Sequence, residues 1–112
     1  PLSQSPPKPK NPIGGAVGKV KAGKPIFLTG EIFNNSTVTQ ETTYIIQIKD
    51  ERGRVVYLNF TNVEIQPKTL KQVSLEWKPS KKGNYTVEAY LWKGWEKPRP
   101  LTRKVETTIT IT

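Results

Sequence analysis

The sequence contains neither cysteine nor histidine. Without cysteine, the chain can form no disulfide framework and no thiolate metal site. Without histidine, it lacks the commonest metal ligand and the usual general base of enzymes. It also has no apolar run that approaches the roughly 18 residues of a membrane-spanning helix. We therefore expect no metal site, no cofactor and no transmembrane segment in this chain.

Other groups that catalysis would need are scarce. Asp50 is the only aspartate, and it is expected at a turn that ends at Gly53. Glycoside hydrolysis needs two carboxyl groups across a cleft, but Glu76 and Glu88 are expected to point outward from different sheets. The sequence also lacks a glycine-rich phosphate loop and the clustered carboxylates of a calcium site. We therefore predict no catalytic residues and no enzymatic activity.

Positive charge dominates the chain, with 18 Lys and Arg against 9 Asp and Glu and a formal net charge of +9. Such a charge suits a polyanion, so acidic glycans are one candidate partner. Most basic residues are scattered through expected turns and the N-terminal part, where solvated lysines are ordinary. Because no recognition motif accompanies the charge, we expect no specific binding of nucleic acid.

Composition divides the chain into residues 1–12 and 13–112. The first part contains five prolines and one large apolar side chain, Leu2. Because it can bury so little surface, we expect an extended Pro/Lys-rich linker or tail that holds the folded domain away from something else. The chain begins at Pro1 and contains no methionine, so we expect a processed segment.

The second part alternates apolar and polar residues, as half-buried antiparallel strands do. Its glycine-rich start, 13–20, is expected to be a weak edge strand, and six stronger segments follow: 25–33, 42–49, 55–61, 70–77, 83–92 and 104–112. No window has the apolar spacing of a helix. About seven short strands predict an all-β fold, an immunoglobulin-like (Ig-like) antiparallel β-sandwich with an extended N-terminal tail.

The segment 55–61 illustrates how the alternation assigns faces. We expect its apolar residues Val56, Leu58 and Phe60 to point into the core. Asn59 then lies on the opposite face, and its side chain is expected to reach solvent. Elsewhere, Trp77 is predicted to be a core residue at the end of its strand.

A tyrosine near the start of the last strand but one is typical of Ig-like sandwiches, where its hydroxyl bonds back to the backbone. Tyr85 has this position, two residues after Gly83 in a Pro/Gly turn. Trp77, Gly83 and Tyr85 are therefore predicted to be structural residues.

Further motifs accompany that tyrosine and carry a family resemblance. They are GKPIFLTGEIFN at 23–34, YIIQIKD at 44–50 followed by Gly53, Trp77-x-Pro79 and Gly83-x-Tyr85-x-Val87. With these motifs, residues 19–112 resemble the CARDB-like, fibronectin-III-like modules of archaeal and bacterial cell-surface proteins. The resemblance implies an extracellular structural or adhesive role without catalysis. Its implied partners are other domains of a surface protein or copies of the chain itself.

Sequons for N-glycosylation are frequent. Four of the six asparagines lie in Asn-x-Ser/Thr sequences: Asn34, Asn35, Asn59 and Asn84. Three of these are expected in turns and Asn59 on an exposed strand face, so glycosylation is expected if the chain is exported. The alternative is that turns and strands are simply rich in asparagine and threonine.

Aromatic residues form the last candidate site. Tyr90 and Trp92 are expected on one outward face, and Trp95 follows in a loop. These rings could contact a partner protein or stack on sugars, or they could cover the rim and end of the sandwich. Two further functions therefore stay open: a carbohydrate-binding module, and a filament subunit that donates the segment 13–20 as a strand to another copy.

Overall fold

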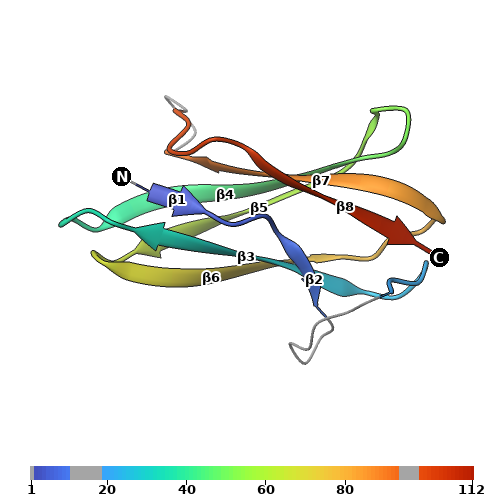
Figure 1. The fold of residues 1–112 in the computed structure, drawn as a ribbon, viewed down its shortest axis with the longest axis horizontal. Coiled ribbons are helices and arrows are strands. Elements are labelled where there is room, and N and C mark those ends of the chain that lie inside the picture. Colours follow the sequence, from blue (N-terminus) through green and yellow to red (C-terminus); the bar gives the residue numbers. More distant parts are fainter. Residues whose placement is uncertain (1, 11–18, 94–98) are drawn as a thin grey trace.

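The structure is a computed structural model that describes residues 2–10, 19–93 and 99–112. Over these residues all regular elements are strands. The same residues contain no helix long and apolar enough to cross a membrane. Two antiparallel sheets pack face to face, which confirms the predicted Ig-like sandwich (Figure 1). The strands are β1 (Leu2–Gln4), β2 (Lys8–Lys10), β3 (Ile26–Asn34), β4 (Gln40–Lys49), β5 (Val55–Ile65), β6 (Thr69–Trp77), β7 (Gly83–Trp92) and β8 (Val105–Ile111).

The two sheets share the strands equally. In the first sheet, β3 is central: β6 pairs along one side of it, and β1 and β2 pair in succession along the other. The second sheet has the order β5-β4-β7-β8. Each sheet therefore has two edges, formed by β1/β2 and β6 in the first and by β5 and β8 in the second.

The N-terminal segment is extended, as expected, but over residues 2–10 it is not a free spacer. β1 and β2 pair with β3, and Pro7 between them is fully buried. The side-chain amide of Gln4 donates to the carbonyl of Ala89 in the second sheet at 3.3 Å. Proline is tolerated because an edge strand has one set of backbone groups that needs no partner. The expected strand 13–20 lies outside the described residues, apart from its last two residues.

The alternation predicted the core correctly in β3, β4, β6, β7 and β8. In these strands the residues expected to point inward are buried between the sheets, except Val105 and Thr107 of β8, which are only partly buried. The largest fully buried side chains include Leu28, Ile32, Tyr44, Ile46, Ile48 and Leu91. Their burial is the main favourable contribution to folding, at about 1.5–3 kcal/mol for each large apolar side chain.

The prediction for β5 was wrong. Leu58 is 60% exposed and Phe60 50% exposed, and Val56 is exposed as well. Val63 and Ile65 explain the error, because they are buried at the far end of the same strand. A strand that buries odd-numbered residues must turn even-numbered ones outward. Asn59 therefore faces inward and is only partly exposed, contrary to expectation.

The structural residues of the Tyr85 motif lie together at one end of the sandwich. The Tyr85 hydroxyl donates to the backbone carbonyl of Lys81 at 2.9 Å, the bond that the motif predicts. Its ring lies edge-on to buried Trp77, with ring centroids 5.3 Å apart. Gly83 has a φ of +147°, which favours glycine because it has no Cβ.

Candidate functional site

The outer face of the second sheet carries the residues that the core does not use. Its cross-strand register places Ile45 of β4 between Phe60 of β5 and Tyr90 of β7. The next row contains Gln47, with Leu58 on one side and Glu88 on the other. The outer face therefore has an apolar part on β5 and a polar, aromatic part on β7.

The apolar part is unusual for a surface strand. Val56, Leu58 and Phe60 are all about half exposed or more, while their neighbour Ile45 is buried although it lies on the outer face. Aromatic and β-branched residues in one cross-strand row pack against one another. The exposed residues Val56, Leu58 and Phe60 therefore form an apolar surface on this outer face that is not part of the sandwich core.

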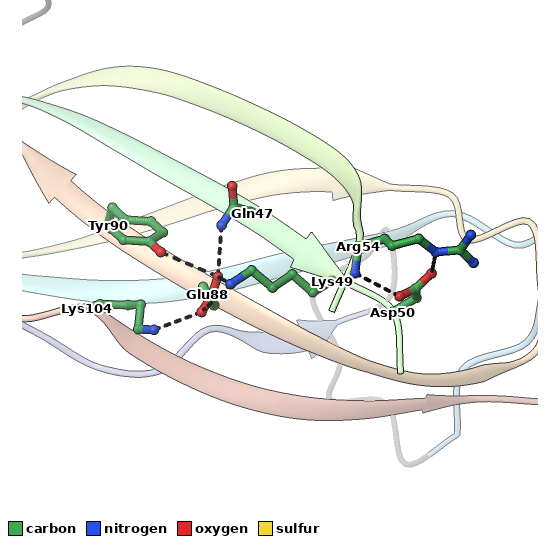
Figure 2. A network of polar contacts seen from close by, with 7 residues as sticks. All are labelled: Gln47, Lys49, Asp50, Arg54, Glu88, Tyr90 and Lys104. Carbon is green, nitrogen blue, oxygen red and sulfur yellow. Dashed lines mark hydrogen bonds and ion pairs between the residues drawn. The ribbon is translucent and has the colours of Figure 1, made fainter. Parts of the chain in front are cut away.

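The polar part is organised around Glu88, which is only 3% exposed (Figure 2). Its carboxylate accepts a hydrogen bond from the Gln47 side-chain amide at 2.9 Å and forms ion pairs with Lys104 at 2.8 Å and Lys49 at 3.2 Å. The Tyr90 hydroxyl donates to the same carboxylate at 3.4 Å. Four side chains, from β4, from β7 and from the residue before β8, thus compensate the charge.

This arrangement changes the acid–base properties of its members. Burial would raise the pKa of Glu88, but the hydrogen bonds from Lys104, Gln47 and Lys49 outweigh it and lower that pKa to about 2. The same carboxylate raises the pKa of Lys104, chiefly through their hydrogen bond. Glu88 is therefore a firmly ionised member of a structural network and not a proton donor near neutral pH.

Two of the three predicted aromatic contact residues lie on this face. Tyr90 and Trp92 are partly exposed on β7, with ring centroids 6.3 Å apart and planes at 83°. Trp95 lies outside the described residues. The indole of Trp92 belongs to the same cross-strand row as Thr43 and Asn62.

A shallow groove opens at this end of β4 and β5. Its volume is about 550 Å³, and its polar lining residues are Glu41, Thr42, Thr43, Asn62, Glu64 and Lys93. Glu41 and Glu64 are direct cross-strand partners, and both are exposed. Like charges in direct opposition destabilise a sheet. Within the described residues, neither glutamate forms an ion pair.

The four sequons fall into two kinds of environment. Asn35 and Asn84 are exposed. Asn34 is fully buried: its side-chain amide donates to the carbonyls of Val38 and Ile65, each at 2.9 Å. An amide used in this way is not accessible to modification in the folded protein. Asn34 ends β3 and Asn84 lies in β7, so the expectation that both lie in turns was wrong. Asn59, which faces inward, donates from its amide to the Tyr57 hydroxyl at 3.1 Å.

The sequence reasoning missed the Glu88 network and the exposed row on β5. Alternation alone places Glu88 and Gln47 on outward faces, but it does not say which strands are neighbours. Lys104 lies 16 positions away in the sequence, and only the pairing of β7 with β8 brings it to Glu88. The sequence signal for β5 was the pair of apolar residues Val63 and Ile65, because both continue the alternation of the strand on the face opposite Leu58 and Phe60.

Comparisons with known proteins support the fold. No protein family and no curated protein matches the sequence. Among solved structures, the C-terminal domain of Wzt has a TM-score of 0.82 at 9% identity, with 99% of this chain and 73% of that chain covered. A CARDB domain from Pyrococcus furiosus has a TM-score of 0.71 at 16% identity, with 99% and 92% covered. The chain is thus a β-sandwich module with the fold of CARDB-like, Ig-like domains, which confirms the resemblance at the level of fold.

A likeness to glycosidases has a different extent. A family 2 β-glucuronidase gives a TM-score of 0.68 at 18% identity, but the match covers 97% of this chain and only 11% of the enzyme. This similarity concerns one β-sandwich within a much larger chain. The Pyrococcus furiosus CARDB domain was solved in complex with di-metal ions. The described residues of the present chain contain no group of three or more His, Cys, Asp or Glu side chains that could hold a metal.

Proposed function

We propose that this chain is a non-catalytic structural or adhesive module of an extracellular cell-surface protein, with the outer face of the second sheet as its contact surface. The exposed row of Val56, Leu58 and Phe60 carries the proposal. Adjacent exposed apolar side chains on one strand are typical of a contact surface, because water solvates them poorly. The CARDB-like fold supports this role.

The sequons support an extracellular location. Asn35 and Asn84 are exposed, and the Asn84 side chain accepts a hydrogen bond from Thr110 at 2.7 Å. A glycan attached at either residue would extend into solvent without disturbing the core. Glycosylation at these two positions, and not at Asn34, is the pattern that an exported, folded module should have.

Proteolysis of intact cells of the source organism, followed by glycopeptide mapping, tests the location. We expect the protein to be cleaved from outside and to carry sugar on Asn35 or Asn84. Buried Asn34 is an internal control within the same peptide region, because it should stay unmodified in folded material. Unmodified protein that is protected inside intact cells would contradict the proposal.

Carbohydrate binding is a second candidate function, and the groove beside Trp92 favours it. Its carboxylates, amide and hydroxyl groups are suited to bonding with sugar hydroxyls, and Trp92 in the adjoining row could stack on a sugar ring. Titration with neutral and acidic soluble polysaccharides should then change tryptophan emission, and Trp92→Ala should abolish the change. Leu70→Ala on the first sheet is the control. No response to any polysaccharide would exclude this function.

Strand donation from the segment 13–20 stays a hypothesis. The described residues before this segment, 2–10, already pair with β3 of the same chain. Val20, at the other end of the segment, is buried and bridges to Ile111. A donor arm would therefore have to extend from between two anchored points.

A further inference from the structure

The four edges of the sandwich differ in how they are protected against pairing with another strand. Natural edge strands are shortened, charged, interrupted by proline or covered. The β1/β2 edge consists of two pieces of three residues with prolines between and within them. The β8 edge is covered at its end, where Val20 bridges to Ile111 and the Thr112 N–H donates to the Val20 carbonyl at 2.8 Å. β6 carries Lys71 and Glu76.

The fourth edge, β5, has few of these devices. It is the longest strand, with 11 residues, no proline and one charged residue, Glu64. Its one irregularity is a bulge near its start, opposite Ile48 and Lys49, so that the strand is regular from Tyr57 onward. Its outer face carries the exposed row of Val56, Leu58 and Phe60. A long, regular and apolar edge is a template for another strand.

We propose that β5 pairs antiparallel with β5 of a second copy of this chain, around a two-fold axis near Asn59, which joins two sandwiches through one continuous eight-stranded sheet. The inference rests on the proposed function for the use of this face as a contact surface. The two-fold arrangement brings Leu58 of each copy opposite Phe60 of the other. Such aliphatic–aromatic pairs stabilise cross-strand contacts, and the arrangement closes without open-ended growth.

Charge complementarity selects this partner and this direction. Arg52 and Arg54 precede β5, where Arg54 also forms an exposed ion pair with Asp50 at 2.9 Å, while Glu64 lies near the end of the strand beside Glu41. Arg54 and Glu64 are each five residues from Asn59, so an antiparallel pair brings the arginines of one copy to the glutamates of the other. A parallel pair would instead place like charges together. The second copy thus supplies the counter-charge that Glu41 and Glu64 lack within the described residues.

Sedimentation velocity of the full chain, from micromolar to near-millimolar concentration, tests the inference. We expect a concentration-dependent shift from the 12.7 kDa monomer to a species of twice that mass. Leu58→Lys should raise the dissociation constant by about tenfold or more, because it places two lysines in the joined row. Leu70→Lys is the matched control, since Leu70 is equally exposed, at 58%, but lies on β6. It should leave the dissociation constant unchanged.

Glu41→Lys separates pairing from simple stability. In the monomer it replaces a like-charged cross-strand pair by an opposite-charged one, so thermal stability should stay the same or rise. In the dimer it places a lysine near the arginines of the second copy, so association should weaken. Opposite signs for these two readouts are not expected from a residue that only stabilises the monomer.

Three results would overturn the inference. One is a monomer at every concentration, and another is an equal loss of association in Leu58→Lys and Leu70→Lys. The third is loss of association after deletion of residues 1–20 in a chain that stays folded by circular dichroism, because the edge would then be filled by a donated N-terminal strand. None of these results bears on the proposed cell-surface location, which the proteolysis of intact cells tests. The proposed dimer and the proposed location can therefore fail separately.

Discussion

The β1/β2 edge and the β5 edge lie on different sheets and solve the same problem in opposite ways. At the first, prolines interrupt the strand, and Gln4 reaches across to the second sheet, where its amide donates to Ala89, Thr102 and Arg103. At the second, Tyr57 reaches across to the first sheet and donates to the carbonyl of Glu76, but the strand itself stays regular and apolar. The sandwich therefore forms without every one of its edges being interrupted or covered. The β1/β2 edge is interrupted and linked to the second sheet, while the β5 edge is the one that we propose to pair with a second copy.

The largest effect should come from the strand beneath the β1/β2 edge. Gly30 of β3 faces the fully buried Tyr44, and a Cβ at this position would overlap with the Tyr44 hydroxyl. Gly30→Ala should therefore lower the free energy of unfolding by about 3 kcal/mol. Chemical denaturation measures this, and Leu58→Ala on the β5 edge, where the side chain is exposed, should cost much less.

A second substitution identifies the cause. Within the described residues, the Tyr44 hydroxyl has no hydrogen-bond partner, and its burial raises the pKa of this group. Tyr44→Phe should consequently cost little or stabilise the protein, since it removes an unsatisfied buried polar group. In the Tyr44→Phe background, Gly30→Ala should lose most of its effect. An unchanged effect would show that the overlap with the hydroxyl is not the reason for glycine.

Acid should destabilise the protein through the Glu88 network on the β7 side of the second sheet. The folded pKa of Glu88 is about 2, below its ordinary value of 4.5, so its ionised form stabilises the protein at pH values above about 4.5. This contribution, up to about 3 kcal/mol, should be lost as the pH falls from 4.5 toward 2. Thermal denaturation across this range should show a steeper loss in the native protein than in Glu88→Gln. Equal slopes would mean that the network contributes nothing.

How far could the sequence predict these features? Alternation was sufficient for the core of β3 and β4, where most apolar residues of each strand lie on one face. It failed on β5, where Leu58 and Phe60 compete with Val63 and Ile65 for the core, and only packing decides between the two faces. The Tyr85 bond was predictable because both partners lie within one turn. The Glu88 network was not, because its members meet only through strand order.

Gln4 and Tyr57, whose side chains form hydrogen bonds between the two sheets, should differ in how much they contribute to the free energy of unfolding. Gln4→Ala removes a partly buried amide donor that serves Ala89 and Thr102, so it should cost about 2 kcal/mol. Its loss should also loosen β1, which amide hydrogen exchange of Ser3 and Ser5 would show. An unchanged exchange rate would mean that pairing with β3 alone holds the segment.

Tyr57→Phe makes the corresponding change at the open edge, and it should have the smallest effect, about 1 kcal/mol. The ring stays in place beside Trp77, with centroids 6.4 Å apart, and the substitution removes only the hydroxyl's hydrogen bonds, the one donated to Glu76 and the one accepted from Asn59. Because the ring packing persists, the outer row of β5 should keep its position, and self-association should be unchanged in sedimentation. If Tyr57→Phe weakened association as strongly as Leu58→Lys, the edge would depend on its link to the first sheet. The contrast between an edge anchored by the fold and an edge available to a partner would then no longer hold.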